Sequence, residues 1–205
     1  MSVADLTVTD LSVARQLALL GAVLLVGGHP AQAAGGHAAG GQSMQRPAST
    51  AELIRSAESA APIALSSKAA VVLIDAAGNS TVLRQGSNNF TCLPDSPSTP
   101  GPDPMCGDAN AMEWAGQWIG HKPPNQNKPG FMYMLAGGTD ASNTDPWAKG
   151  PSPGDAWIET GPHVMLVGIG PETLAGYLSG PRPDTRQPYV MWAGTPYAHL
   201  MLPVR

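Results

Sequence analysis

The 205-residue sequence lacks several features that would assign it to a functional class directly. Charged residues make up only 13% of it, and its eleven Lys and Arg are scattered, with no basic run of five or more. Recognition of phosphate backbones needs clustered basic residues, so nucleic acid is not an expected partner. No apolar run approaches the roughly 20 residues of a membrane-spanning helix. We therefore expect no stable membrane span after processing.

Motifs that identify common enzymes are also missing. The sequence has no Gly-x-Ser-x-Gly elbow, no His-Glu-x-x-His pair and no phosphate-binding G-x-G-x-x-G loop. These absences argue against nucleotide use and zinc proteolysis. They also leave nucleophilic catalysis without a signature.

Cysteine is scarce: Cys92 and Cys106 are the only two. Outside the cytosol such a pair usually forms a disulfide. Closing this loop stabilises a fold by about 3 kcal/mol in the chain-entropy model, and less where prolines already restrict the unfolded loop. The rival interpretation, a redox or metal pair, lacks a C-x-x-C spacing. We predict a structural disulfide.

Glycine and proline, with 24 and 21 residues, make up about 22% of the chain, whereas about 12% is usual. This composition is typical of short elements joined by ordered loops. Alternating and β-branched apolar runs predict strands at 69–75, 80–85, 131–136, 163–168, 189–193 and 199–204. Capping and helical spacing predict helices at 51–60 and 109–120, with a turn or two at 171–178. The expected fold is α+β, an antiparallel β-sheet with two or three short helices and long Pro/Gly-rich loops.

The N-terminal segment has the parts of a secretory signal peptide. Arg15 precedes an apolar run from Leu17 to Val26, and Ala31-Gln32-Ala33 forms a small-x-small cleavage site. We therefore predict a signal peptide over 1–33 with cleavage near Ala33, a flexible N-terminus over 34–48, and a single domain over 49–205. The mature protein is expected to be periplasmic or secreted.

Several local patterns resemble an uncharacterised family of exported bacterial proteins. They are Thr91-Cys92 with Asp103-Pro104-Met105-Cys106, the stretch 140–146 (Asp-Ala-Ser-Asn-Thr-Asp-Pro), the stretch 160–165 (Thr-Gly-Pro-His-Val-Met), and the stretch 193–201 (Ala-Gly-Thr-Pro-Tyr-Ala-His-Leu-Met). The resemblance implies no activity, cofactor or catalytic residue. It suggests only that the C-terminal two thirds form one domain.

The most unusual local pattern is His-x-Met, which occurs at His163-Val164-Met165 and at His199-Leu200-Met201. Residues i and i+2 of a strand share a face, so each pair would project an imidazole and a thioether side by side. If the two strands are neighbours, four such groups can converge, and Met132-Tyr133-Met134 can add a third strand to that face. Imidazole with thioether suits copper, especially Cu(I). Met also fills irregular cores, and a purely structural role is the favoured alternative.

A second candidate is the loop 137–146, in which Asp140 and Asp145 stand with Ser142 and Asn143. Oxygen ligands close together suit a hard cation such as calcium, although the loop is not an EF-hand. Asx residues in loops also form turns through their own backbone, and this is the favoured role.

The sequence thus leaves three hypotheses. The first is a small-ligand or metal-ion binding protein with His163, Met165, His199 and Met201 at its site. The second is a hydrolase with a histidine general base, and the third is an envelope protein without a site. Four ligands around a common point would favour metal. A His–carboxylate hydrogen bond in a cleft would favour catalysis. Buried histidines bonded only to backbone would favour the structural role.

Overall fold

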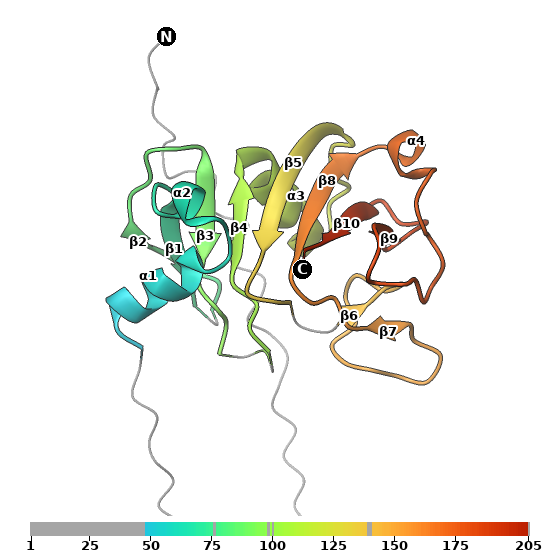
Figure 1. The fold of residues 1–205 in the computed structure, drawn as a ribbon, viewed down its shortest axis with the longest axis horizontal. Helices are drawn as coiled ribbons and strands as arrows, with labels where there is room; N and C mark the ends of the chain where they lie inside the picture. Colours follow the sequence, from blue (N-terminus) through green and yellow to red (C-terminus); the bar gives the residue numbers. More distant parts are fainter. Residues whose placement is uncertain (1–47, 76, 98, 100, 139–140, 205) are drawn as a thin grey trace, which may run out of the picture.

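A computed structural model describes residues 48–75, 77–97, 99, 101–138 and 141–204. The elements are α1 (Thr50–Glu58), α2 (Ile63–Ser66), β1 (Ala70–Ile74), β2 (Ser80–Arg84), β3 (Phe90–Leu93), β4 (Met105–Asp108), α3 (Ala109–Ile119), β5 (Asn127–Met134), β6 (Ala141–Ser142), β7 (Trp157–Ile158), β8 (His163–Ile169), α4 (Pro171–Leu174), β9 (Tyr189–Met191) and β10 (His199–Pro203). The fold is rich in sheet, with few and short helices (Figure 1).

Eight of these strands form one sheet in the order β2-β1-β3-β4-β5-β8-β10-β9. All neighbouring pairs are antiparallel except β1 and β3, which run parallel. The sheet is therefore mixed, and the expectation of a purely antiparallel sheet was wrong at this pair. The chain between β2 and β3 crosses β1, which brings β3 alongside β1 in the same direction. The short strands β6 and β7 pair separately.

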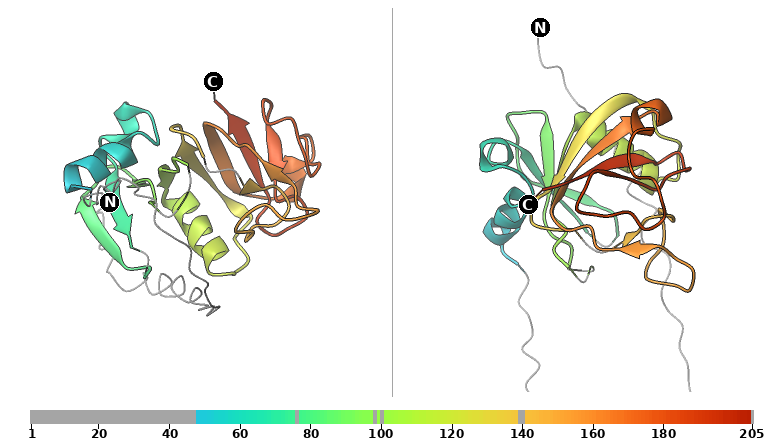
Figure 2. Two further views of the ribbon diagram at one scale, coloured as in Figure 1. Left: turned by 90° about the horizontal axis from the view of Figure 1, so that it is seen from below. Right: turned by 45° about the vertical axis from the view of Figure 1, so that its right-hand side comes forward.

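The helices cover opposite faces of the sheet (Figures 1 and 2). We call the face beneath α1 and α2 the front and the face beneath α3 the back. In the view from below in Figure 2, α1 and α2 lie on one side of the strands and α3 lies on the other. The back face under α3 is where the candidate site lies.

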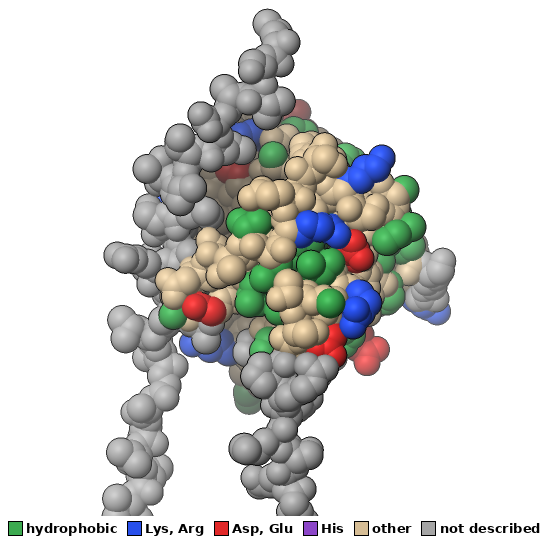
Figure 3. All heavy atoms as spheres, turned by 90° about the vertical axis from the view of Figure 1, so that its left-hand side faces the viewer, with side chains coloured by type: hydrophobic (Ala, Val, Ile, Leu, Met, Phe, Trp, Pro, Cys, Tyr) green, Lys and Arg blue, Asp and Glu red, His purple; other side chains and the backbone are tan. Residues whose placement is uncertain are grey.

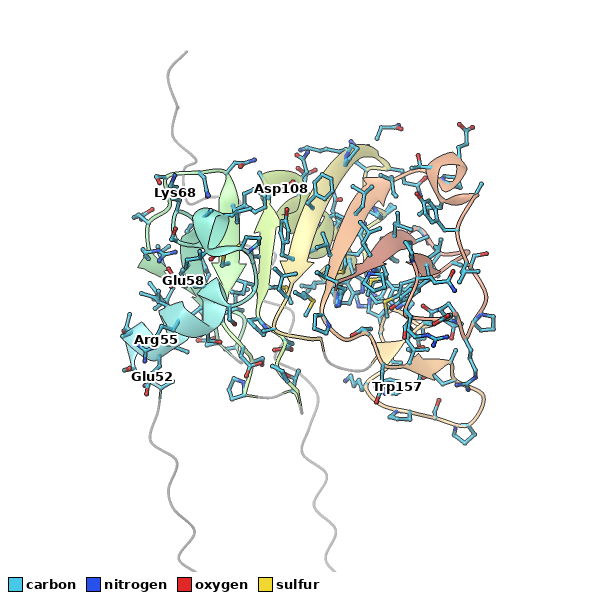
Figure 4. The ribbon with its side chains drawn as sticks, viewed as in Figure 1. Glu52, Arg55, Glu58, Lys68, Asp108 and Trp157 are labelled. Atoms are coloured by element: carbon cyan, nitrogen blue, oxygen red, sulfur yellow. A yellow bond between two sulfur atoms is a disulfide. The ribbon has the colours of Figure 1, made fainter. Side chains whose placement is uncertain are left out.

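Local sequence explains how α1 and α3 begin. Ser49 and Glu52 form the capping box at the start of α1, which satisfies two backbone N–H groups. Asp108 caps α3 by accepting from the Ala111 N–H at 2.8 Å, and its second oxygen accepts from the Phe131 N–H of β5 at 3.0 Å. Figure 4 labels Asp108 where β4 meets α3. This carboxylate therefore joins the start of α3 to the sheet.

The close approach of α3 to the sheet depends on Gly130 in β5. A Cβ at this position would lie 2.3 Å from the backbone nitrogen of Ala111. Only glycine lets the first turn of α3 rest directly on β5. The seat of α3 on the back face is thus fixed at its N-terminal end.

The front face carries the predicted disulfide. Cys92 and Cys106 are bonded and lie directly opposite each other on β3 and β4. They pack with small apolar side chains beneath α1, namely Ala57, Ala60, Ala61, Ala69 and Val71. At this end of the molecule acidic and basic side chains lie interspersed among apolar ones (Figure 3). The cystine thus belongs to a compact core of small residues.

Other expectations agree or differ locally. The disulfide joins two strands, β3 and β4, that were not predicted. The predicted strand at 69–75 and the predicted helix at 109–120 are present within a residue or so. The predicted signal peptide and flexible N-terminus lie almost wholly outside the described residues. Within the described ranges no helix is long and apolar enough to cross a membrane.

Candidate functional site

Three methionines form a row on the back face of the sheet. Met132 of β5 lies opposite Met165 of β8, and Met165 lies opposite Met201 of β10. Side chains directly opposite each other on neighbouring strands have their Cβ atoms about 5 Å apart. The predicted neighbourhood of the two His-x-Met strands is therefore present, and β5 adds its own methionines to the same face.

The two histidines lie at opposite ends of this row. His163 pairs with Pro203 of β10, and His199 precedes Pro203 by four residues. Four residues of strand correspond to about 13 Å. The antiparallel register thus places His163 and His199 on one face but far apart along it, with Met165 and Met201 between them.

Each histidine has a methionine directly across from it. His163 lies opposite Met134 of β5, and His199 lies opposite Met191 of β9. Each histidine also has a methionine two residues later on its own strand and on the same face. Two similar groups of one imidazole and two thioethers result.

A cavity of about 780 Å³ lies between α3 and the back face. All seven methionines of the described residues line it, namely Met105, Met112, Met132, Met134, Met165, Met191 and Met201. Of the eleven leucines in the same part of the chain, only Leu93 does so. Figure 4 shows how densely side chains fill the region around β8 and β10. We call this space the methionine cavity.

His199 is the most enclosed polar group of the cavity, with 1% of its surface exposed. Its Nδ1 lies 2.9 Å from the carbonyl oxygen of Tyr197. A carbonyl can only accept, so Nδ1 carries the hydrogen and Nε2 of the neutral ring keeps a lone pair. This Nε2 is buried and has no hydrogen-bond partner among the residues that the structure describes. A buried acceptor without a partner is costly unless a ligand satisfies it.

The environment keeps His199 neutral. Burial lowers its pKa to about 4, the hydrogen bond to Tyr197 acts in the opposite direction, and the positive charge of His163 adds to the lowering. Protons therefore do not compete for Nε2 at neutral pH.

His163 is held in the same way at the other end. Its Nδ1 lies 2.6 Å from the carbonyl oxygen of Gly161, and the residue is 3% exposed. Burial lowers the pKa of His163, and the hydrogen bond to Gly161 opposes this. Its ring occupies the space that a side chain at Gly138 would need, because a Cβ there would lie 2.9 Å from its Cε1. Both imidazoles are thus fixed by the carbonyl oxygen of the residue two positions before them.

Tryptophans surround the His199 end of the cavity. The ring centroids of Trp114 and Trp192 lie 5.1 and 4.9 Å from that of His199, both edge to face. Trp192 is anchored by its indole N–H, which donates to the Ser142 carbonyl at 2.9 Å. The faces of such rings attract cations. This end of the cavity therefore combines a lone pair, thioethers and indole rings.

Two carboxylates of the described residues line the cavity, and both are already engaged. Glu113 forms an ion pair with Lys128, and Asp103 accepts from the Ser96 N–H at 2.9 Å. Among the described residues no group of three or more His, Cys, Asp and Glu is close enough to hold a metal ion. Any ion in the cavity would depend on thioether and imidazole donors.

The oxygen-rich loop has a different character. Asp145 is exposed and accepts from the Trp147 N–H at 2.9 Å, which is an Asx turn. Ser142 donates to Asp155 at 2.5 Å, while Asp140 lies outside the described residues. The geometry of Asp145 fits turn formation, and the calcium hypothesis has no support among the residues described.

The sequence reasoning missed part of the site. It did not include Met191, Met105, Met112 or the two tryptophans beside His199. Met191 and Trp192 lie within the predicted strand 189–193, but nothing local indicates that this strand is next to β10. Only the pairing of β9 with β10 places Met191 opposite His199.

Comparison with protein-family models, with curated proteins and with solved structures finds no match. The resemblance to exported bacterial proteins therefore stays a prediction, and the site has to be interpreted from its own chemistry.

Proposed function

We propose that this chain is an exported α+β protein that binds a soft metal ion, Cu(I), on the methionines and histidines of the methionine cavity. The observation that carries the proposal is the placement of methionine. All seven described methionines line this one cavity, whereas only one of the eleven leucines in the described part of the chain does so.

The donor set agrees with Cu(I) chemistry. Thioether sulfur and neutral imidazole are the ligands that Cu(I) prefers, whereas hard cations such as calcium take oxygen ligands. All these donors are uncharged, so they suit an ion of single charge better than a divalent one. The rings of Trp114 and Trp192 add a cation–π attraction at the His199 end.

The decisive experiment is Cu(I) titration of the purified mature protein under anaerobic conditions, with a coloured Cu(I) chelator as competitor. We expect the protein to withdraw Cu(I) from the chelator. An ion bound only by the native state stabilises it by about 2.7 kcal/mol at a hundredfold excess over Kd. For a domain of this size that is a rise in Tm of about 5–10 °C.

A matched pair of variants makes the test specific. Met165→Leu with Met201→Leu removes two sulfurs at nearly constant volume, a change that usually costs less than about 1.5 kcal/mol per site. We expect this variant to fold and to lose Cu(I) affinity by at least tenfold. The control is Leu166→Met with Leu200→Met on the front face, which should leave the affinity unchanged. No withdrawal of Cu(I) by the wild type and no rise in Tm would overturn the proposal.

The size of the cavity supports a second candidate, a small and mostly apolar organic ligand. At about 780 Å³ the cavity is within the range of small-molecule sites, and an ion alone needs far less space. The probe is the apolar dye N-phenyl-1-naphthylamine, whose fluorescence rises in dry surroundings. Saturable dye binding without any Cu(I) binding would favour this candidate over the metal.

The other hypotheses have less support. A hydrolase would need a histidine oriented by a carboxylate, but His163 and His199 both use Nδ1 on backbone carbonyls. Those backbone bonds are the pattern expected for a structural role. That role does not account for the unpartnered Nε2 of His199 or for the placement of the methionines.

A further inference from the structure

The register of the sheet separates the metal donors into two groups. The first is the triad His199, Met191 and Met201, which we call triad 1. The second is the triad His163, Met134 and Met165, which we call triad 2. In both, a histidine has one methionine directly opposite on the neighbouring strand and a second two residues later on its own strand.

One ion cannot use both imidazoles. Their backbone positions are four residues apart in register, about 13 Å along the strands. Met165 and Met201 occupy the register positions between the two imidazoles. A Cu–N or Cu–S bond is only about 2.0–2.3 Å long, as for similar metals. A single site at the centre would have sulfur donors and neither histidine.

Each triad, in contrast, is compact. Its two strand neighbours have Cβ atoms about 5 Å apart, and its i and i+2 residues are about 6.6 Å apart on one face. Methionine has three rotatable bonds and can bring its sulfur across such a gap. One imidazole nitrogen and two thioether sulfurs give a three-coordinate set with no net charge.

We infer that the methionine cavity holds two soft monovalent ions, one on triad 1 and one on triad 2. This inference rests on the proposed function and adds the stoichiometry and the residues of each site. Met165 and Met201 lie directly opposite each other, so the two sites adjoin through a pair of thioethers, with Met132 next in the row.

The two sites are not equivalent. Triad 1 lies against Trp114 and Trp192, whereas the His163 ring of triad 2 lies against Gly138. Two positive charges held in one cavity repel each other, so we expect the second ion to bind more weakly than the first. Occupation of triad 1 should quench tryptophan fluorescence, and occupation of triad 2 should affect it little.

The test is titration with Ag(I), a redox-stable soft monovalent ion, followed by native mass spectrometry and tryptophan fluorescence. We expect the wild type to bind two Ag(I) per chain. Met191→Leu with Met201→Leu should bind one ion without the quenching, and Met134→Leu with Met165→Leu should bind one ion with the quenching retained. The control, Leu166→Met with Leu200→Met, should still bind two.

The outcomes separate the inference from the proposed function. Two bound ions with the expected division between the variants support both. One bound ion in the wild type, or three and more, overturns the two-site inference and leaves Cu(I) binding standing. No bound ion overturns both. If a leucine variant fails to fold, the stoichiometry of the wild type still decides the question.

Discussion

The two faces of strands β5, β8 and β10 have the same backbone and the same neighbours but different side chains. The back face carries Met132, Met134, His163, Met165, His199 and Met201, and the front face carries Phe131, Tyr133, Val164, Leu166, Leu200 and Leu202. Among the described residues of these three strands, no methionine or histidine is on the front. An apolar sheet alone does not require this division, because leucine would serve both faces. The difference indicates that burial alone does not explain which residues occupy the back face.

The largest expected difference in stability is between a lysine placed on the back face and one placed on the front face. Met201→Lys on the back buries an ammonium at a position that is 1% exposed, and we expect the free energy of unfolding to fall by more than about 4 kcal/mol. Phe131→Lys on the front, where the side chain is 44% exposed, should cost less than about 1 kcal/mol. Urea unfolding measures both. Similar losses would contradict the different burial of these two positions.

Acid should destabilise the back face. His199 has a folded pKa of about 4, below the ordinary 6.5, so the unfolded chain binds the proton more readily between these values. The contribution of neutral His199 to the free energy of unfolding is therefore fully present above pH 6.5. It falls by about 3 kcal/mol as the pH drops toward 4. His163, whose pKa is also lowered, adds to the loss.

The measurement for this prediction is the urea midpoint between pH 7 and pH 4. His199→Leu should flatten most of the pH dependence, while Leu200→Ala on the front should lower stability equally at every pH. A wild type with constant stability across this range would contradict the burial of His199.

Removal of the disulfide should lower the stability of the protein without changing Cu(I) binding in the methionine cavity. Cys92→Ala with Cys106→Ala should lower the free energy of unfolding by about 2 kcal/mol, because the unfolded chain gains freedom. The cystine packs beneath α1 on the front, so Cu(I) affinity should stay within about twofold of the wild type. A large loss of Cu(I) binding in a folded variant would show that the two regions are coupled.

The smallest effect concerns the helix that covers the back. Gly116 in α3 has open space where a Cβ would be, so Gly116→Ala should stabilise the protein by about 0.5–1 kcal/mol through helix propensity. Gly130→Ala, which meets the backbone of Ala111, should have the opposite sign. Thermal unfolding of the pair tests how closely α3 rests on β5.

Part of this site was predictable because it depends on local periodicity. The His-x-Met spacing places His163 with Met165, and His199 with Met201, on one face of any strand that contains them. The capping residues Ser49 and Asp108 likewise indicate where α1 and α3 begin. These features need only a few neighbouring residues to be recognised.

The rest depends on contacts between distant segments. The offset of four residues between His163 and His199 is set by the register of β8 against β10, which no local pattern specifies. Met191 joins the site only because β9 pairs with β10. The strands β3 and β4 flank a proline-rich loop whose composition hides them. The parallel pairing of β1 with β3 follows from the crossing of β1 by the chain between β2 and β3, which no local pattern indicates.

The order of strands also determines when the cavity can exist. β10, close to the C-terminus, lies between β8 and β9, so β9 has no place in the sheet until residues 199–203 are available. The His199 end of the cavity therefore forms only when a later segment of the chain inserts between two earlier ones. We expect it to be among the last parts of the sheet to assemble during folding.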